Sequence, residues 1–482
     1  MKTVTQSDMV MQWQDVDLTI QGLFGQRCES LARQTQFVRR HSQLTGKLFA
    51  QTLIFGWMSK PEASYTTLQQ LLASQDCHVS SQALEKRMKP QAVAFLHALQ
   101  QELLGMCVEH EGVMTELLQR FEGVYLQDGT IISLPEPLKE YYQGCGGGRK
   151  DDDHEYGGGE SALRIQVRLN VTTGSLQGPW LQASREEENQ GEGSMQQSPL
   201  PARSLYVTDS KYVNVKAIKE HQERETFFLT HGRADLVLTD GRGVKASLST
   251  FLQARASQEV IDEWVNLGAN PNNVCSVRIM AFHVSEQTAQ RLRCQAHQHS
   301  QTRPKGSRCN VRVGKKHARA SNDGRHRRKM SQKRFELADW TIIISNVPKQ
   351  LLAAHEARVL MRARWQIELL WRLWKERGQI DIWRSEKPMR ILCEVYAKLI
   401  GCIIQHWIIL KGCWHHPDRS MVKASQAVQA MALTYLVSLS GPITSQRVLE
   451  MMGMMMQRSR LNRRSARYST ADLLDDPRKA LS

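Results

Sequence analysis

The sequence predicts an α/β core flanked by helical segments at both ends. Three observations support this prediction: residues up to about 115 have a helical pattern, residues 123–232 alternate strand-like runs with turns, and the chain after Lys375 is again helical in pattern. Alternation of strand-like and helical segments is typical of α/β folds. With 482 residues, the chain is long enough for two or more domains and a substantial core.

The N-terminal segment is expected to be helical throughout. Residues 49–58 are apolar, and residues 68–73 and 79–88 suggest two short helices joined by a turn. Ser80 or Ser81 is a suitable N-cap for the second of these helices. The pair has the pattern of a DNA-binding helix-turn-helix. A helical bundle that packs on the rest of the protein explains the pattern equally well.

Four strands are predicted in the next segment, at 125–133, 162–171, 205–213 and 227–230. The first is expected to be interrupted by an acidic turn at Asp128, and Asp209 is expected at the C-terminal end of the third. A carboxylate at a strand end in an open α/β sheet points into the crevice where ligands bind.

The strand at 162–171 alternates apolar and polar residues, so one of its faces is expected to be buried. Its polar face carries Arg168, which is predicted to lie on an exposed sheet surface.

Residues 361–375 are predicted to form one helix, because they contain no Gly or Pro and are rich in Leu, Arg, Gln, Glu and Lys. At about 100° per residue, one stripe of this helix would carry the four charged residues Arg364, Glu368, Arg372 and Lys375. A helix with one salt-bridged side explains this stripe. A site in which the Glu binds a metal ion and the cations bind a phosphate explains it as well.

Asp128, Asp209 and Glu368 together provide three carboxylates, which are sufficient ligands for Mg²⁺ or Mn²⁺. Two such metal ions, about 4 Å apart, could activate a water molecule and stabilise the leaving oxygen of a phosphodiester. An isolated Asp-Gly-Thr is more often a turn than a ligand. The order Asp, Asp, Glu beside a basic helix is much more specific.

In these residues the chain resembles the DDE transposases of the insertion sequence 4 family, which are related to the transposase of transposon 5. The match is carried by Asp128 in Gln-Asp-Gly-Thr, by Asp209 in Val-Thr-Asp-Ser-Lys-Tyr, and by Arg364, Glu368 and Lys375 in the spacing of the family's Tyr-x2-Arg-x3-Glu-x6-Lys signature. Two positions depart from the family pattern: Met361 replaces the signature Tyr, and Lys211 replaces a small residue after the second Asp. Neither change removes a metal ligand.

The resemblance implies a ribonuclease-H-like catalytic core interrupted by a β-rich insertion, with helical domains at both ends. The implied boundaries are a DNA-binding domain at 1–118, the core at 119–232 and 347–385, the insertion at 233–346, and a C-terminal domain for possible dimerisation at 386–482. It also implies that Asp128, Asp209 and Glu368 hold two Mg²⁺ ions, for which Mn²⁺ can substitute. Arg364, Arg372 and Lys375 would bind phosphates, and Arg168, on the strand beside the first Asp, would approach DNA as the alternative to an exposed sheet surface.

Charge and composition favour a nucleic-acid partner. The formal net charge is +16 and the pI is about 9.5, which suits polyanions, although binding to a membrane surface would also explain it. Residues 303–334 contain thirteen basic residues, among them Arg327, Arg328 and Lys329, against the single acidic residue Asp323. This segment is predicted to be a mobile loop that becomes ordered on DNA phosphates.

Other features predict a cytoplasmic, nucleoid-associated protein. The ten Cys residues include no C-x-x-C pair, so reduced thiols are expected, and no N-terminal signal segment is present. Residues 391–410 are apolar but contain Glu394, Lys398 and His406, so they are predicted to form a buried helix and no membrane span.

The sequence therefore predicts a cut-and-paste DNA transposase that acts on double-stranded element ends and target DNA, in the family's manner as a homodimer. One alternative is a catalytically decayed DNA-binding protein derived from such an enzyme. Another is a metal-dependent nuclease that performs no strand transfer.

Overall fold

The structure is a computed structural model that describes residues 6–106, 108, 115–145, 160–186, 194–212, 214–239, 244–268, 270, 273–301, 332–414, 416–441, 443–461 and 470–480. The chain forms two compact units. The first contains residues 1–115, 125–199 and 365–471, and the second contains residues 116–124, 200–364 and 472–482.

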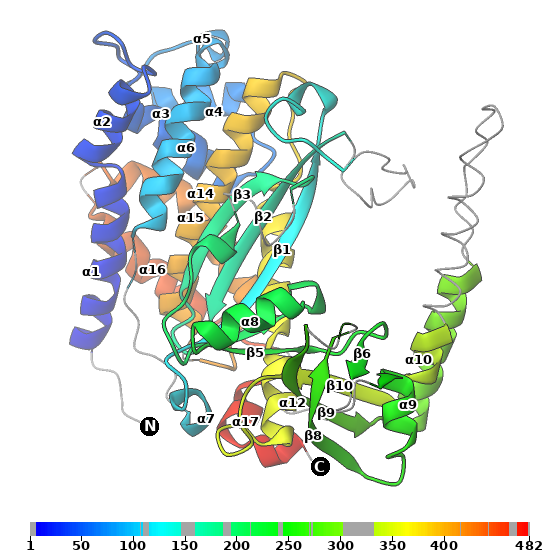
Figure 1. Cartoon of the computed structure of the whole chain (residues 1–482). Helices are drawn as coiled ribbons and strands as arrows, with labels where there is room; N and C mark the ends of the chain where they lie inside the picture. Colours follow the sequence, from blue (N-terminus) through cyan, green and yellow to red (C-terminus); the bar gives the residue numbers. More distant parts are fainter. Residues whose placement is uncertain are drawn as a thin grey trace, which may run out of the picture. The chain divides into compact units, whose positions relative to one another are not determined.

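The first unit combines helices from both ends of the chain with three strands (Figure 1). Its helical elements are α1 (Gln6–Leu23), α2 (Gln26–Gln34), α3 (Gly46–Ser59), α4 (Tyr65–Ala73), α5 (Ser81–Arg87), α6 (Pro90–Leu104), η1 (Glu136–Leu138), η2 (Met195–Gln197), α13 (Trp365–Arg372), η4 (Leu373–Arg377), α14 (Pro388–Cys413), α15 (Met421–Ser438) and α16 (Ser445–Gln457). The predicted N-cap is confirmed, because the Ser80 hydroxyl accepts the backbone N–H of Ala83 at 3.1 Å.

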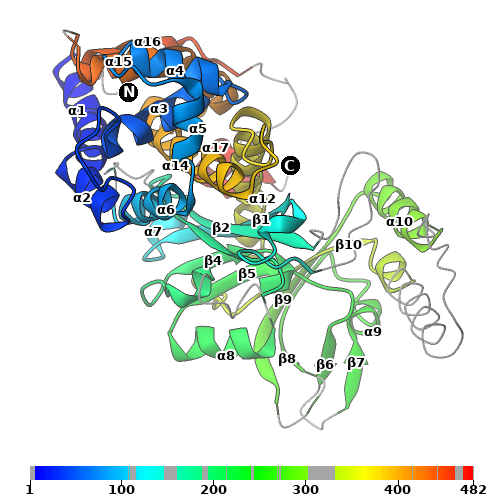
Figure 2. The ribbon, with the colours of Figure 1, turned by 90° about the horizontal axis from the view of Figure 1, so that it is seen from above.

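The N-terminal and C-terminal helices of this unit form one bundle. Helix α3 packs against α14 and α15, and α1 packs against α16. Figure 2 shows α1, α3, α15 and α16 within one group of helices. The bundle predicted as one explanation of the N-terminal pattern is therefore present, and it includes helices from the far end of the chain.

The strands of the first unit form an antiparallel meander in the order β3-β2-β1. They are β1 (Val124–Leu134), β2 (Ser161–Asn170) and β3 (Leu176–Ala183), drawn side by side in Figure 1. The register of β1 with β2 is continuous from Tyr125 opposite Asn170 to Leu134 opposite Ser161. The predicted acidic turn at Asp128 is therefore wrong, because the ladder passes through this residue without a break.

Helix α14 lies at the centre of the first unit. It packs against α1, α3, α6, α15 and α16, and nearly all of its residues from Ile391 to Cys413 are buried. By length and composition this helix could cross a membrane, but every residue of its most apolar window is buried inside the protein. The sequence prediction of a buried helix at this position agrees with that arrangement.

The turn between β2 and β3 packs on the C-terminal half of α14. The buried His406 ring bonds through Nε2 to the carbonyl oxygen of Gly174 at 2.8 Å, and Trp414 Nε1 donates to the carbonyl of Thr172 at 3.3 Å. Gly174 has φ +71°, and a Cβ there would lie 2.5 Å from the Trp414 ring, so glycine is required for both conformation and packing.

The second unit contains the remaining elements. They are α7 (Glu116–Gln119), β4 (Leu205–Thr208), η3 (Ser210–Tyr212), α8 (Val215–Glu223), β5 (Phe227–His231), β6 (Val237–Thr239), β7 (Lys245–Ser247), α9 (Leu248–Gln253), β8 (Val260–Leu267), β9 (Cys275–His283), α10 (Glu286–Gln301), β10 (Trp340–Ser345), α12 (Ala354–Ala363), most of α17 (Thr470–Asp475), and η5 (Pro477–Ala480). The strand order in this unit is β4-β5-β10-β9-β8-β6-β7.

Strands β4 and β5 are parallel, with helix α8 between them in the chain, and the other pairs of this unit are antiparallel. Strand β10 is hydrogen-bonded to β5 on one side and to β9 on the other. The strands β6–β9, which lie in the segment predicted as a β-rich insertion, therefore extend the sheet that contains β4 and β5.

The buried His406 predicts a loss of stability in mild acid. Burial lowers the pKa of this imidazole to about 4, and the Gly174 carbonyl only partly opposes the shift. The unfolded chain therefore binds a proton near pH 6.5 that the folded chain does not, so stability falls as the pH drops from about 6.5 towards 4. We expect His406 to account for a loss of about 2 kcal/mol between pH 7 and pH 5.

Urea unfolding of the wild type and of His406→Gln at these two pH values measures this contribution. The variant should lose less stability on acidification than the wild type does. His41→Gln, at an exposed position, is the control and should behave as the wild type. Equal acid sensitivity of the wild type and His406→Gln would contradict the assignment.

Candidate active site

Asp128 lies in the middle of β1 and is half-buried. It is opposite Val167 of β2, and its neighbour Gln127 is opposite Arg168. Because successive side chains of a strand point to opposite faces of the sheet, Asp128 and Gln127 lie on different faces. Gln127 is fully buried, and its side-chain oxygen accepts Arg168 Nε at 2.9 Å.

Asp209 follows directly after β4, at the strand end where the sequence predicts it. All four residues of β4 are buried, whereas Asp209 is half-buried. Its Oδ1 accepts the backbone N–H of Ser210 at 2.6 Å and the Ser210 hydroxyl at 3.2 Å. These local bonds at the start of η3 orient the carboxylate.

Glu368 is carried by α13 and is half-buried. Ile367, Leu370 and Trp371 are the buried residues of this helix. The single helix predicted for 361–375 is divided in the structure: α12 ends at Ala363, and α13 gives way to a π-helical turn at 373–377. The backbone N–H of Gly378 donates to Leu373 O at 3.0 Å, the i→i+5 bond of a π turn.

The predicted phosphate-binding cations have different environments. Arg364 is half-buried between α12 and α13, and Lys375 is half-buried in the π turn. Arg372 is exposed; its guanidinium lies 5.4 Å from the ring centroid of Trp365, and its Nε lies 3.8 Å from Glu376. The other three predicted cations, Arg327, Arg328 and Lys329, lie outside the described residues.

The three candidate metal ligands are divided between the units. Asp128 and Glu368 belong to the first unit, and Asp209 belongs to the second. Within the part of the chain that the structure describes, no group of three or more His, Cys, Asp or Glu side chains is arranged to hold a metal ion. The chemical type of the donors, three carboxylates, suits a hard divalent cation.

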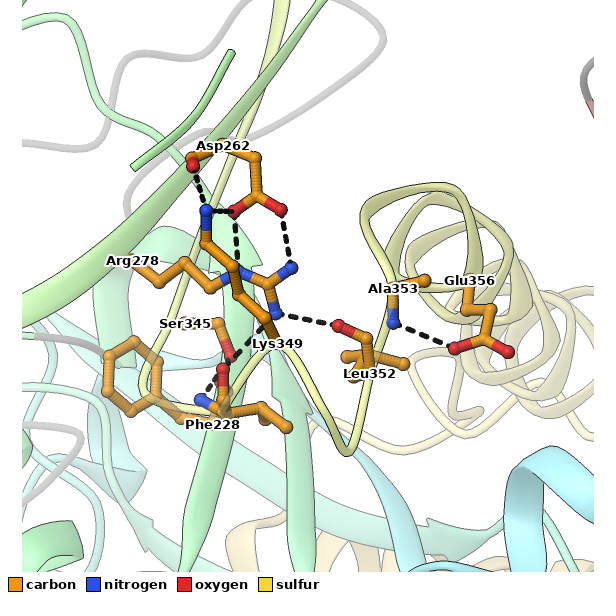
Figure 3. Close-up of polar contacts among 9 residues, drawn as sticks. Phe228, Asp262, Arg278, Ser345, Lys349, Leu352, Ala353 and Glu356 are labelled. Atoms are coloured by element: carbon orange, nitrogen blue, oxygen red, sulfur yellow. Dashed lines mark hydrogen bonds and ion pairs between the residues drawn. The ribbon is translucent and has the colours of Figure 1, made fainter. Parts of the chain in front are cut away.

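In the second unit, the loop from β10 to α12 is held by a buried arginine (Figure 3). Arg278 of β9 is fully buried, and it forms a two-point ion pair with Asp262 of β8 at 2.7 and 2.8 Å. Its Nη1 also donates to the carbonyl oxygens of Val347 at 3.2 Å and Leu352 at 2.7 Å. Burial alone would raise the pKa of Asp262, but Arg278 and then Lys349 lower it below its usual value.

Further contacts fix both ends of this loop. Ser345 Oγ donates to the carbonyl of Phe228 at 2.6 Å and accepts the backbone N–H of Val347 at 3.0 Å. At the other end, the Glu356 carboxylate accepts the backbone N–H of Ala353 and a bond from Arg120, both at 2.8 Å. The start of α12, the helix that leads to Arg364, is therefore rigidly attached to the sheet of the second unit.

Comparison with known families identifies the family of this chain. Residues 119–403 match the family model described as a transposase DDE domain. This match covers more than half of the chain and includes Asp128, Asp209 and Glu368.

The chain belongs to the DDE transposase family.

Several curated proteins are similar to this transposase over most of their length. The transposase for insertion sequence element IS231F of Bacillus thuringiensis subsp. israelensis is 22% identical over 387 residues, which cover 78% of this chain and 76% of that protein. The transposase for IS231E of Bacillus thuringiensis subsp. finitimus is 21% identical, with 78% and 75% covered. The transposase for IS1151 of Clostridium perfringens is 20% identical, with 79% and 77% covered. The chain is an insertion-sequence transposase, as the sequence predicts.

The prediction for Arg168 of this transposase is wrong. Arg168 is fully buried and neither lies on an exposed sheet surface nor reaches the outside of the protein. Besides Gln127, its guanidinium binds the carbonyl oxygens of Met195, at 2.6 Å, and of Ser198. The sequence signal was misinterpreted because a later segment, residues 194–199, covers the polar face of β2.

The two departures from the family signature differ in their surroundings. Met361 is 5% exposed and contributes to the apolar face of α12. Lys211 is exposed in η3, two residues after Asp209.

Arg278 and Arg255 both pair with carboxylates of β8. The Arg278 network predicts that replacing these two arginines lowers the free energy of unfolding by very different amounts. Arg278→Met leaves Asp262 without its buried partner and two carbonyls without donors, so the free energy of unfolding should fall by about 3–5 kcal/mol. Arg255→Met removes a pair with Glu263 whose side chains are 29% and 35% exposed, and it should cost only about 1 kcal/mol. Urea unfolding of both variants measures the two costs. Equal losses of unfolding free energy would show that the buried Arg278 network stabilises the protein no more than the partly exposed Arg255 pair does.

Proposed function

We propose that this transposase cuts the ends of its element and joins them to target DNA, with Asp128, Asp209 and Glu368 as ligands of two Mg²⁺ ions, for which Mn²⁺ can substitute. The observation that carries the proposal is the family match at 119–403, which contains these three carboxylates in the family's order together with Arg364 and Lys375. A divalent cation is implied by the family, and carboxylates are the donors that such cations prefer.

Local contacts of each proposed ligand support the proposal. Asp128 is fixed by the β1–β2 ladder, Asp209 by the Ser210 bonds, and Glu368 by a helix whose apolar face is buried. When bound, the metal ions supply a polarised nucleophile and stabilise the leaving oxygen. The cations Arg364, Arg372 and Lys375 bind the phosphates, and Lys375 lies half-buried in the π turn.

We further propose a ribonuclease-H-like core. Three antiparallel strands are followed in the chain by β4, helix α8 and the parallel strand β5, which supports this proposal. The proposed functional division of the chain is a DNA-binding segment at 1–118, the core at 119–232 and 347–385, the insertion at 233–346, and a C-terminal segment at 386–482 for pairing with a second copy.

The proposed partners are double-stranded DNA, namely the terminal inverted repeats and the target, and a second transposase molecule in the DNA complex. The net charge of +16 supports the DNA partner. The proposed location is the bacterial cytoplasm, in association with the nucleoid.

The role of Glu368 predicts a separation of cleavage from binding. Glu368→Gln should abolish Mg²⁺-dependent cleavage of a linear DNA that carries the sequences flanking the gene, because an amide is a poor ligand for the cation, while DNA binding should persist. Glu376→Gln is a matched control, since Glu376 lies on the same helical segment, is exposed and pairs with Arg372. Retained cleavage by Glu368→Gln would overturn the assignment.

The same assay distinguishes the alternatives. Nicking at the ends followed by joining to a plasmid establishes a transposase, and nicking without joining indicates a nuclease. Tight end binding by the wild type without cleavage, even with Mn²⁺, indicates a decayed DNA-binding protein.

The basic segment predicts a change in salt dependence. If Arg327, Arg328 and Lys329 each contact a phosphate, replacing all three with Gln should weaken DNA binding and reduce the slope of log K against log salt by about 3. A triple Gln variant at the exposed positions Lys60, Lys139 and Arg447 removes the same charge elsewhere and serves as the control. Equal slopes for the two triple variants would remove residues 327–329 from the DNA interface.

A further inference from the structure

The helix that carries Glu368 ends in an unusual way. The π turn at 373–377 is followed by irregular backbone, in which Gln379 has φ +46°. Gly378 packs so closely that a Cβ would lie 2.6 Å from Cys402 Sγ of α14 and 2.7 Å from Trp374 O. Within this segment the carbonyl of Gln379 accepts the backbone N–H of Ile382 at 3.2 Å. Side chains from other elements supply further donors to its carbonyl groups.

Those donors come from the two helices packed behind the segment. Lys398 of α14 donates from Nζ to the carbonyl oxygens of Ile382 at 2.8 Å and Gln379 at 3.2 Å. Gln429 of α15 donates to the carbonyl of Arg377 at 3.0 Å. Three carbonyls within six residues of chain are thus held by side chains of the bundle.

Lys398 is itself held by a buried carboxylate. Its Nζ lies 2.7 Å from Glu394 Oε1, one helical turn earlier on α14, and both side chains are 2% exposed. The ammonium group donates to the two carbonyls, and the nearby carboxylate balances its charge. The other oxygen of Glu394 is 3.5 Å from the backbone nitrogen of Arg384, so the pair contacts the segment between residues 379 and 384.

A buried ion pair of this kind is seldom retained for stability. Removing two charges from water is costly, and well-packed apolar residues in their place are often as stable or more stable. What apolar residues would not supply is donors directed at the carbonyls of residues 379 and 382. The geometry therefore suits a role in fixing the segment more than a role in strengthening the core.

We propose that Lys398, oriented by Glu394, is a positioning residue for the reaction: it fixes the end of the Glu368 helix and so keeps Glu368 and Lys375 in their working orientation. Lys375 lies within the π turn, and its carbonyl accepts the backbone N–H of Gln379, the residue whose own carbonyl binds Lys398. Glu368 lies only five residues before the π turn. This inference rests on the proposed catalytic role of Glu368.

The test uses the full-length protein with the double substitution Glu394→Leu and Lys398→Met, which replaces the pair with apolar residues and leaves no unpaired buried charge. At saturating protein, the rate of cleavage of bound DNA should fall about tenfold or more, and the Mg²⁺ concentration for half-maximal rate should rise. DNA affinity should remain close to that of the wild type. The melting temperature should fall because the carbonyls of Gln379 and Ile382 lose a donor, but the protein should stay folded at the assay temperature. A role in folding alone would not produce this combination.

The control is Lys411→Met, which removes a cation from the same helix; Lys411 lies 3.9 Å from Asp15. Its cleavage rate and Mg²⁺ requirement should equal those of the wild type. The inference is wrong if the double variant cleaves bound DNA at the wild-type rate, or if its activity falls only in proportion to its folded fraction or its DNA affinity. Cleavage by Glu368→Gln would instead refute the proposed function, so the two failures are distinguishable.

Discussion

Irregular backbone inside this protein is held by buried cations that each bind two carbonyl oxygens. Arg168 binds those of Met195 and Ser198, Arg278 binds those of Val347 and Leu352, and Lys398 binds those of Gln379 and Ile382. Leaving an interior carbonyl unpaired costs about as much free energy as losing a hydrogen bond. One long side chain with several donors can therefore satisfy two carbonyls at once. The segment that Arg168 binds leads into β4 and Asp209, and the segment that Arg278 binds leads into α12. The segment that Lys398 binds follows the Glu368 helix.

Helix α14 determines how two of the neighbouring segments are placed in the first unit. Because it is buried on all sides, each polar group along it requires a partner from an adjoining segment. Glu394 and Lys398 find theirs in residues 379–384, and His406 finds its partner in the turn between β2 and β3. Three of the polar residues of this largely apolar helix thus connect the Glu368 segment and the β-meander to the same bundle.

The sequence predicted most of the elements and the family, but it could not show what covers each face. Alternation in residues 162–171 correctly predicts β2. It also predicts an exposed Arg168, because no local sequence feature indicates that residues 194–199 cover that face of the strand. Asp128-Gly129 resembles a turn by composition, whereas pairing with Val167 and Gln166 keeps it in a strand. The π turn has only Gly378 as a local signal. Lys398 and Gln429 lie 19 and 52 positions after the carbonyls of Gln379 and Arg377 that they bind.

The buried cations differ in how their charge is balanced. This difference determines how far each ion pair can shift without leaving a buried charge poorly solvated. Arg278 faces a carboxylate that is 24% exposed, so water shares in the solvation of the pair. Glu394 and Lys398 are both 2% exposed, so their mutual attraction and the carbonyl dipoles must replace nearly all of the lost hydration. A pair under that constraint has little freedom of geometry, since a shift of either partner leaves a buried charge incompletely solvated. The desolvation that makes such a pair costly in free energy also restricts its geometry. The pair therefore holds the segment that follows the Glu368 helix in a defined position.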